Sequence, residues 1–191
     1  ANMGVLISSA SKNILIDALF DNSYNMLSVT PKNIVSKINK FEAPFKSIDL
    51  IFITHYHGDH FTATMVAEYL SINKTVKVVC SNITSSALKQ SEGYKVDTSR
   101  IVAITPLLYK SIDTMVNDIK LKVMRLRHSD MDGQEENVGF LFDMEGVNVF
   151  HSGDSGGDEE TGFYSSGRGL GSKQSPPGQA YCPIQGDAPG R

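Results

Sequence analysis

One run of seven residues, 54–60 (Thr-His-Tyr-His-Gly-Asp-His), places three imidazoles and one carboxylate close together in the sequence. Three of the five histidines of the chain lie in this run. Imidazole and carboxylate groups suit Zn²⁺, and also Fe or Mn, so the run predicts a metal site. The alternative is a polar loop whose histidines bond to backbone groups, but the clustering of three histidines favours the metal.

The spacing of these donors, and the strand that precedes them, indicates how they could converge. Residues 47–53 (Ser-Ile-Asp-Leu-Ile-Phe-Ile) have the length and β-branching of a buried strand. In extended backbone, side chains two residues apart leave the same face, so His55 and His57 can bind one ion. Gly58 lets the chain turn sharply and redirect Asp59 and His60 towards a second ion nearby.

The motif His-x-His-x-Asp-His after an apolar strand and a threonine resembles the signature of the metallo-β-lactamase superfamily. The resemblance covers roughly residues 4 to 155. It implies that His55, His57, Asp59 and His60 are metal ligands, and that Asp59 is also a catalytic residue that orients the nucleophile.

Two further donors each end a predicted strand. By resemblance, His128 matches the third histidine of the first metal site, and Asp154 matches the aspartate that bridges both metals. Three histidines with one position open for water form a ligand set of catalytic zinc, which is compatible with this assignment. On spacing alone, Asp154 is equally a turn residue next to Gly153.

Asp17 and His151 are expected to play supporting roles. By resemblance, Asp17 at the end of a predicted strand supports a ligand histidine from behind, and a solvated turn carboxylate is the alternative. His151, three residues before Asp154, is expected to contact a ligand or face the substrate. A surface histidine satisfied by its neighbours is the alternative for this residue.

The sequence departs from the family pattern in one respect. The family has a further histidine on a later strand that completes the second metal site, and no histidine follows His151. Asp59, His60 and Asp154 remain for that site, with water or a carboxylate of the tail. The tail carboxylates are Asp158, Glu159 and Asp187. Either the sequence is truncated, or an unusual tail or a second copy of the chain, in a homo-oligomer, covers the exposed sheet.

Strands and helices alternate in the first half of the predicted fold. Residues 5–8 and 13–17 predict a hairpin, and helices are expected after the caps Thr30, Thr62 and Ser81, with Pro31 as the first helical residue. A Met and aromatic stripe in the second helix is ordinary core. The strands expected between and after these helices are 47–53, 76–80 and 100–105.

The second half is richer in strands. Residues 119–126 alternate until the phase slips at Met124, as a bulged strand would allow, and residues 138–144 and 147–150 predict a hairpin. Together with the resemblance, this pattern predicts an α/β (α+β) fold, the αββα sandwich of the superfamily, of which the first half and the opening strands of the second half are visible.

Composition limits the class of protein. At 191 residues and 40% apolar content, the chain can bury one core, assigned to a domain at 1–154. The segment 155–191 is rich in Gly and Pro and reads as a flexible or non-native tail. A net charge of −3 without long basic runs argues against nucleic acid as a partner.

Neither a spanning segment nor a signal peptide is visible, so a membrane is not expected as a partner. Two cysteines, Cys80 and Cys182, form no disulfide framework, which fits a cytoplasmic protein, and Cys80 is expected to be a core residue.

The function predicted from these residues is a zinc-dependent hydrolase with one or two ions. A zinc-activated hydroxide would cleave a small-molecule carbonyl substrate, such as a β-lactam, lactone, ester or thioester. One alternative is a metal-dependent phosphodiesterase or nuclease. Another is a non-catalytic metal-binding remnant, because one ligand is missing from the second site.

Overall fold

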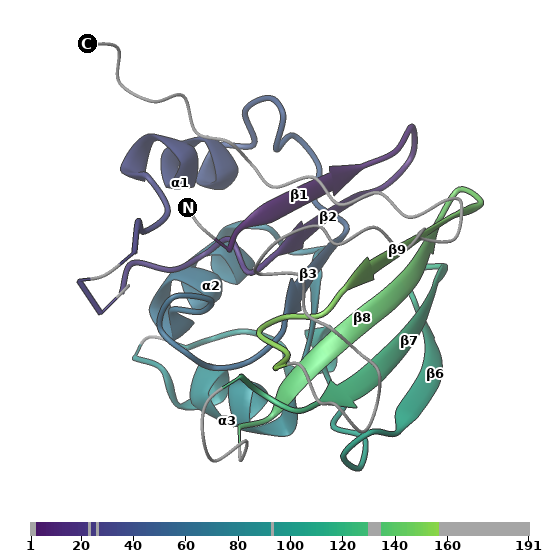
Figure 1. The fold of residues 1–191 in the computed structure, drawn as a ribbon. Coiled ribbons are helices and arrows are strands. Elements are labelled where there is room, and N and C mark those ends of the chain that lie inside the picture. Colours follow the sequence, from purple (N-terminus) through teal and green to yellow (C-terminus); the bar gives the residue numbers. More distant parts are fainter. Residues whose placement is uncertain (1–2, 23, 26, 93, 130–134, 157–191) are drawn as a thin grey trace, which may run out of the picture.

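The computed structural model describes residues 3–22, 24–25, 27–92, 94–129 and 135–156. Within these residues, two β-sheets lie face to face, and three helices cover the outer face of the first sheet (Figure 1). This arrangement confirms the predicted fold class. It provides three layers of the sandwich, helix, sheet and sheet, while a second helical layer is not found in the described part of the chain.

The first sheet has the strand order β1-β2-β3-β4-β5. Its first pair is antiparallel, as the predicted hairpin requires, and the remaining pairs are parallel. Parallel neighbours need crossover connections, which the three helices supply. The strands are β1 (Val5–Ser8), β2 (Asn13–Ile16), β3 (Leu50–Ile53), β4 (Lys77–Cys80) and β5 (Ile101–Ala103), and the helices are α1 (Lys32–Asn39), α2 (Ala63–Ile72) and α3 (Asn82–Gln90).

The alternation of side chains along β3 divides the interior into two cores. Ile51 and Ile53 pack with the helices, whereas Leu50 and Phe52 face the second sheet. Because both faces of this strand are covered, its sequence is apolar throughout rather than alternating. The buried strand therefore carries the residues that follow it to a fixed place at the edge of the sandwich.

The second sheet is an antiparallel meander in the order β6-β7-β8-β9. The predicted hairpin is confirmed, and its turn residues Glu145 (φ 55°) and Gly146 (φ 87°) both have the left-handed conformation of a tight hairpin turn. The strands are β6 (Ser111–Val116), β7 (Ile119–Leu126), β8 (Asn137–Met144) and β9 (Val147–His151).

The second sheet differs from the sequence-based prediction in two respects. No strand was predicted at 111–116, where β6 forms an exposed sheet edge and both Ile112 and Met115 are exposed. The bulge expected at Met124 is absent, since the pairing of β7 with β8 is regular through Leu126. The side chain of Leu126 instead lies on the face of the sheet opposite to that of Leu121 and Val123. It is buried there against Gly139, which has no side chain to occupy the same space.

The helix caps agree with the sequence in part. Ser81 caps α3 by accepting a hydrogen bond from the backbone of Thr84, as expected. Thr62 precedes α2 but bonds to Asp21 rather than to the helix. Thr30 is not the cap of α1, because its hydroxyl donates to the carbonyl of Ala18, and α1 begins after Pro31.

Cys80, on β4, belongs to the core between the helices and the first sheet. Cys80 is fully buried in the first core, as expected, and burial raises the pKa of its thiol to about 12.

None of the described helices has the length and apolar character needed to span a bilayer. Of the predicted tail, Ser155 pairs with His128 and the N–H of Gly156 donates to the carbonyl of Arg127, so backbone pairing reaches two residues into the segment 155–191. Residues 157–191, with Asp158, Glu159, Cys182 and Asp187, lie outside the described residues.

Candidate metal centre

The first part of the centre forms where β2 and β3 end side by side. The backbone N–H of Asp17 donates to the carbonyl of Phe52 (3.1 Å), and a left-handed φ of 44° turns its carboxylate towards Thr54. One carboxylate oxygen accepts from the Thr54 N–H (2.9 Å), and the other accepts from the Thr54 hydroxyl (2.7 Å). Asp17 therefore fixes the point at which the histidine-rich run leaves the sheet.

The run then folds back on itself in one tight turn. The backbone N–H groups of His60 and Phe61 both donate to the carbonyl of His57, at 3.0 and 2.9 Å. This turn brings Nδ1 of His60 to 2.9 Å from Oδ2 of Asp17. Both side chains are almost completely buried, so the ring of His60 is held in one orientation.

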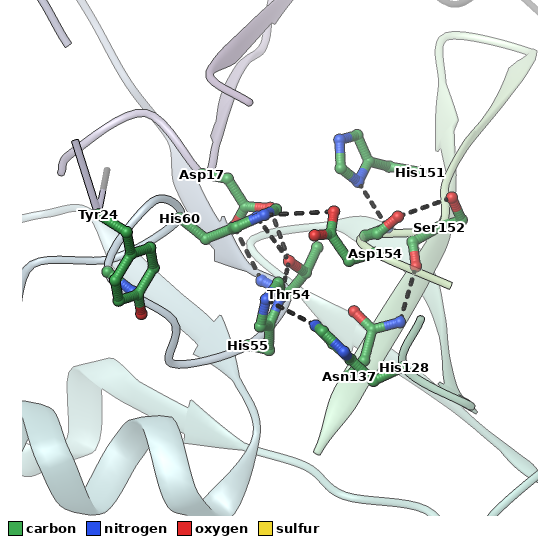
Figure 2. Close-up of polar contacts among 12 residues, drawn as sticks. Asp17, Tyr24, Thr54, His55, His60, His128, Asn137, His151, Ser152 and Asp154 are labelled. Carbon is green, nitrogen blue, oxygen red and sulfur yellow. Dashed lines mark hydrogen bonds and ion pairs between the residues drawn. The ribbon is translucent and has the colours of Figure 1, made fainter. Parts of the chain in front are cut away.

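The second sheet contributes the two donors that lie far away in the sequence. His128 pairs with Ser155 in an isolated antiparallel bridge. The N–H of Ser129 donates to the carbonyl of Asp154 (2.8 Å), and that of Gly156 donates to Arg127 (3.0 Å). This short ladder lies beside the histidine-rich run, so that His128 approaches His55 and Asp154 approaches His60 (Figure 2).

Two groups of potential ligands result from this convergence. His55, His57 and His128 each offer one atom, and the three atoms lie within 4.8 Å of one another. His55, His60 and Asp154 do the same. Asp59 lies half-buried in the turn and belongs to neither of these groups, so its assignment as ligand and catalytic residue stays a prediction.

The contact between His55 and His128 fits a metal. Their Nε2 atoms face each other at 3.2 Å. Tetrahedral zinc with Zn–N bonds of about 2.0–2.1 Å holds two ligand nitrogens about 3.3–3.4 Å apart. Burial lowers the pKa of His55, and the charge of the neighbouring His60 lowers it further. The ring of His55 is therefore neutral, as a metal ligand must be.

His60 and Asp154 also have the character of a cation site. Nε2 of His60 is buried and makes no well-aligned hydrogen bond within the described residues, although Oδ1 of Asp154 lies 3.2 Å away. Burial alone would lower the pKa of His60, but Asp17 and Asp154 outweigh it and raise the pKa to about 10. Burial opposes ionisation of Asp154, yet its contacts with His60 hold the pKa of the carboxyl below its ordinary value. A metal ion here would take the place of the proton between these side chains.

His151 lies beside the centre without belonging to either ligand group. Its Nδ1 accepts a hydrogen bond from the backbone of Gly153 (3.2 Å), and burial lowers the pKa of its ring. It also lines a cavity of about 500 Å³ between the edge strands β1 and β9. This hydrogen bond connects His151 to the loop that carries Asp154, and its supporting role stays a prediction (Figure 2).

Three residues of the centre were not assigned a role from the sequence. Thr54 joins Asp17 to the ring of His55, whose Nδ1 is 3.0 Å from the Thr54 hydroxyl. Asn137 donates to the carbonyl of Ser152 (3.1 Å), and Glu135 lies 3.8 Å from His57. The sequence could have indicated only Thr54, because it directly precedes the histidines. Asn137 and Glu135 contact segments that are distant in the sequence, so no local pattern indicates them.

Gly153 explains how the loop before Asp154 can pass so close to β3. Its φ of 59° favours glycine, and a Cβ atom there would overlap Oδ1 of Asn137 and lie 2.7 Å from Cβ of Thr54. Asn137 and Thr54 thus form a closely fitted wall behind the loop. This packing sets the position of Asp154 relative to His60.

The comparison with known protein families agrees with this fold and donor set. Residues 12–165 match the model of the Beta-lactamase superfamily domain, which covers most of the chain. The chain therefore belongs to this family, as the resemblance implied.

Two curated relatives are more specific. A UPF0173 metal-dependent hydrolase of Saccharolobus solfataricus is 27% identical over 151 residues, which are 79% of this chain and 57% of the relative. A protein of the same description from Pyrococcus furiosus is 28% identical over 116 residues, covering 58% of this chain and 45% of the relative. The chain spans about half the length of the curated relatives it matches.

Solved structures show the same fold at low identity. Igni18, a metallo hydrolase from Ignicoccus hospitalis, has a TM-score of 0.52 and 22% identity, covering 84% of this chain and 60% of that one. A putative metal-dependent hydrolase from Parabacteroides distasonis has a TM-score of 0.50 and 13% identity, covering 80% and 57%. At these identities, the comparison establishes the fold alone.

Proposed function

We propose that this chain carries the centre of a zinc-dependent hydrolase that cleaves a small-molecule carbonyl substrate, such as a β-lactam, lactone, ester or thioester. The observation that carries the proposal is the convergence of His55, His57 and His128 from two sheets, with donor atoms within 4.8 Å. The names of the relatives, metal-dependent hydrolases, support hydrolysis as the reaction class.

The residues divide into ligands and supports. His55, His57 and His128 would hold one ion, and His60 and Asp154 would hold a second with His55 or Asp59. Zinc bound by three histidines lowers the pKa of a water ligand towards about 7 and polarises the substrate carbonyl. Asp17 and Thr54 fix the ring of His60, and Asp59 is proposed to orient the attacking water.

Zinc and a carbonyl substrate are favoured over the alternatives by chemistry and charge. Three imidazole ligands suit zinc, although Fe or Mn can use the same ligands. The net charge of −3 gives no general attraction for phosphodiester polymers. A nuclease would be expected to show a basic surface stripe.

A substrate panel tests this function. The purified, zinc-loaded protein would be assayed with chromogenic esters, thioesters, lactones, β-lactams and phosphodiesters, together with its Asp59→Asn and Asp113→Asn variants. We expect turnover of at least one carbonyl compound that is abolished by a chelator and reduced at least about 100-fold in Asp59→Asn, but not in the control Asp113→Asn. Turnover of phosphodiesters alone would contradict the carbonyl assignment. Bound zinc without any turnover would favour a non-catalytic metal-binding remnant.

A further inference from the structure

Glu135 is an acidic residue at the rim of the metal centre that neither the sequence motif nor the proposed ligand set uses. Its Oε1 lies 3.8 Å from Nε2 of His57, and the two side chains are 21% and 25% exposed. The carboxylate is therefore beside a proposed ligand and still reached by solvent. A substrate that approaches the open side of His57 would meet this charge.

Hydrogen bonding keeps the Glu135 carboxylate in this place. Oε1 accepts a hydrogen bond from the hydroxyl of Tyr56 (3.1 Å), which precedes His57 in the same run. The side chain is thus attached to the histidine-rich loop itself, across the gap between the two sheets. This hydrogen bond holds the Glu135 carboxylate beside His57.

The neighbouring Glu136 has a different and structural environment. Its Oε2 accepts from the N–H of Ile83 (3.1 Å) and the hydroxyl of Thr105 (3.0 Å), and its Oε1 lies 3.9 Å from Arg125. Nη2 of Arg125 donates to the backbone carbonyl of Glu135, at 3.5 Å. Arg125 thus contacts the carboxylate of Glu136 and the backbone of Glu135, while Oε1 of Glu135 faces Tyr56 and His57.

From this placement we infer that Glu135 is a specificity-determining residue, which repels anionic ligands from the centre and so favours neutral or cationic carbonyl substrates. The inference rests on the proposed function for the existence of a loaded metal centre. A unit charge about 6 Å from a bound anion, at an effective dielectric constant of about 40–80, changes affinity about three- to tenfold. The effect is large enough to bias the choice between an ester and a phosphodiester.

Inorganic phosphate is a probe that reports this charge without turnover. Its dissociation constant for the zinc-loaded protein would be measured by calorimetry for wild type, Glu135→Gln, Glu135→Lys and Asp113→Asn. Asp113 is the matched control, because it is an exposed carboxylate on β6 and its removal changes the net charge equally. We expect phosphate to bind about three- to tenfold more tightly to Glu135→Gln and still more tightly to Glu135→Lys, with a change below about twofold for Asp113→Asn.

Turnover separates this inference from the proposed function. In an active protein, Glu135→Gln should raise kcat/KM for bis(p-nitrophenyl) phosphate relative to that for p-nitrophenyl acetate. A phosphate shift without any turnover would support the role of Glu135 and refute the hydrolase. If the protein turns over substrate but phosphate binds equally well to the wild type and to both Glu135 variants, the role of Glu135 alone is refuted. If the protein does not bind zinc, both the proposed hydrolase function and the role of Glu135 are refuted.

Discussion

Asp17 is the residue on which the orientation of the proposed second site depends. Its carboxylate bonds to Thr54 and to His60, and all three side chains are buried. We predict that Asp17→Asn lowers zinc affinity about 10–100-fold, because outer partners of metal ligands have effects of this size. Competition with a chromophoric chelator measures the affinity.

A control for this variant lies at the other end of the same two strands. Asp49 also joins β2 to β3, by accepting from the N–H of Asn13 (2.8 Å), but it lies before β3 rather than after it. Asp49→Asn should leave zinc affinity within about twofold. Equal effects of the two substitutions would show that general stability, and not the contact with His60, is being measured.

Gly153 tests whether the packing behind Asp154 is as close as the structure indicates. In Gly153→Ala, the new methyl group meets Asn137 and Thr54 and the backbone keeps a left-handed φ, so we expect a loss of about 2–5 kcal/mol in the free energy of unfolding. Gly146→Ala is the matched control, since its φ is also positive (87°) but no atom lies within 4 Å of the added methyl. It should lose only about 1–2 kcal/mol in urea titrations. The same loss in both variants would contradict the close fit.

At the scale of elements, β3 holds the two sheets together through Phe52. Its ring stacks on that of Phe140, with 4.6 Å between the ring centroids. It also contacts the ring of Phe142 edge-on, with 5.2 Å between the centroids. Phe52→Ala should destabilise the protein by about 3–5 kcal/mol, as for other buried aromatic residues. Ile72→Ala at the exposed end of α2 should cost less than about 1 kcal/mol, and denaturant unfolding compares the two. A small loss for Phe52→Ala would mean that the sheets are not packed as described.

The thiol of Cys80 reports on the core between the helices and β4. Because burial raises its pKa to about 12, the group stays protonated and shielded at pH 8–9, where an exposed thiol of ordinary pKa near 8.5 would react. In the variant Cys182→Ser, we expect no reaction with a disulfide reagent at pH 8.5 until denaturant is added. Rapid reaction of the folded protein would place Cys80 outside the core.

At the scale of the whole molecule, the sequence was informative where structure depends on neighbours in the chain. The apolar run at 47–53 is local and predicted β3. The motif at 54–60 is also local, and its resemblance to a family, together with the order of strands and helices, predicted the fold class and a metal site. The edge strand β6 could not be predicted, since an exposed strand with Ser111, Asp113 and Thr114 lacks a buried apolar face. Leu126 was misread because its burial over Gly139 depends on a partner strand.

The remaining parts of the centre depend on contacts between distant segments. His128 and Asp154 come into the same region because 127–129 pairs with 154–156, and Glu135 contacts Tyr56, 79 positions away in the chain. Such pairings follow from the packing of two sheets rather than from spacing in the sequence. The family pattern supplied His128 and Asp154, whereas nothing in the sequence indicated Glu135 or Asn137.

The central claim is that imidazoles from two sheets share one cation. Anomalous diffraction from crystals of the zinc-loaded protein, recorded on both sides of the zinc absorption edge, tests it directly. We predict a strong anomalous peak within bonding distance of His55, His57 and His128, and a second peak beside His60 and Asp154 if both groups are filled. A map without a peak between the three histidines, or with zinc bound only elsewhere on the surface, would contradict the account.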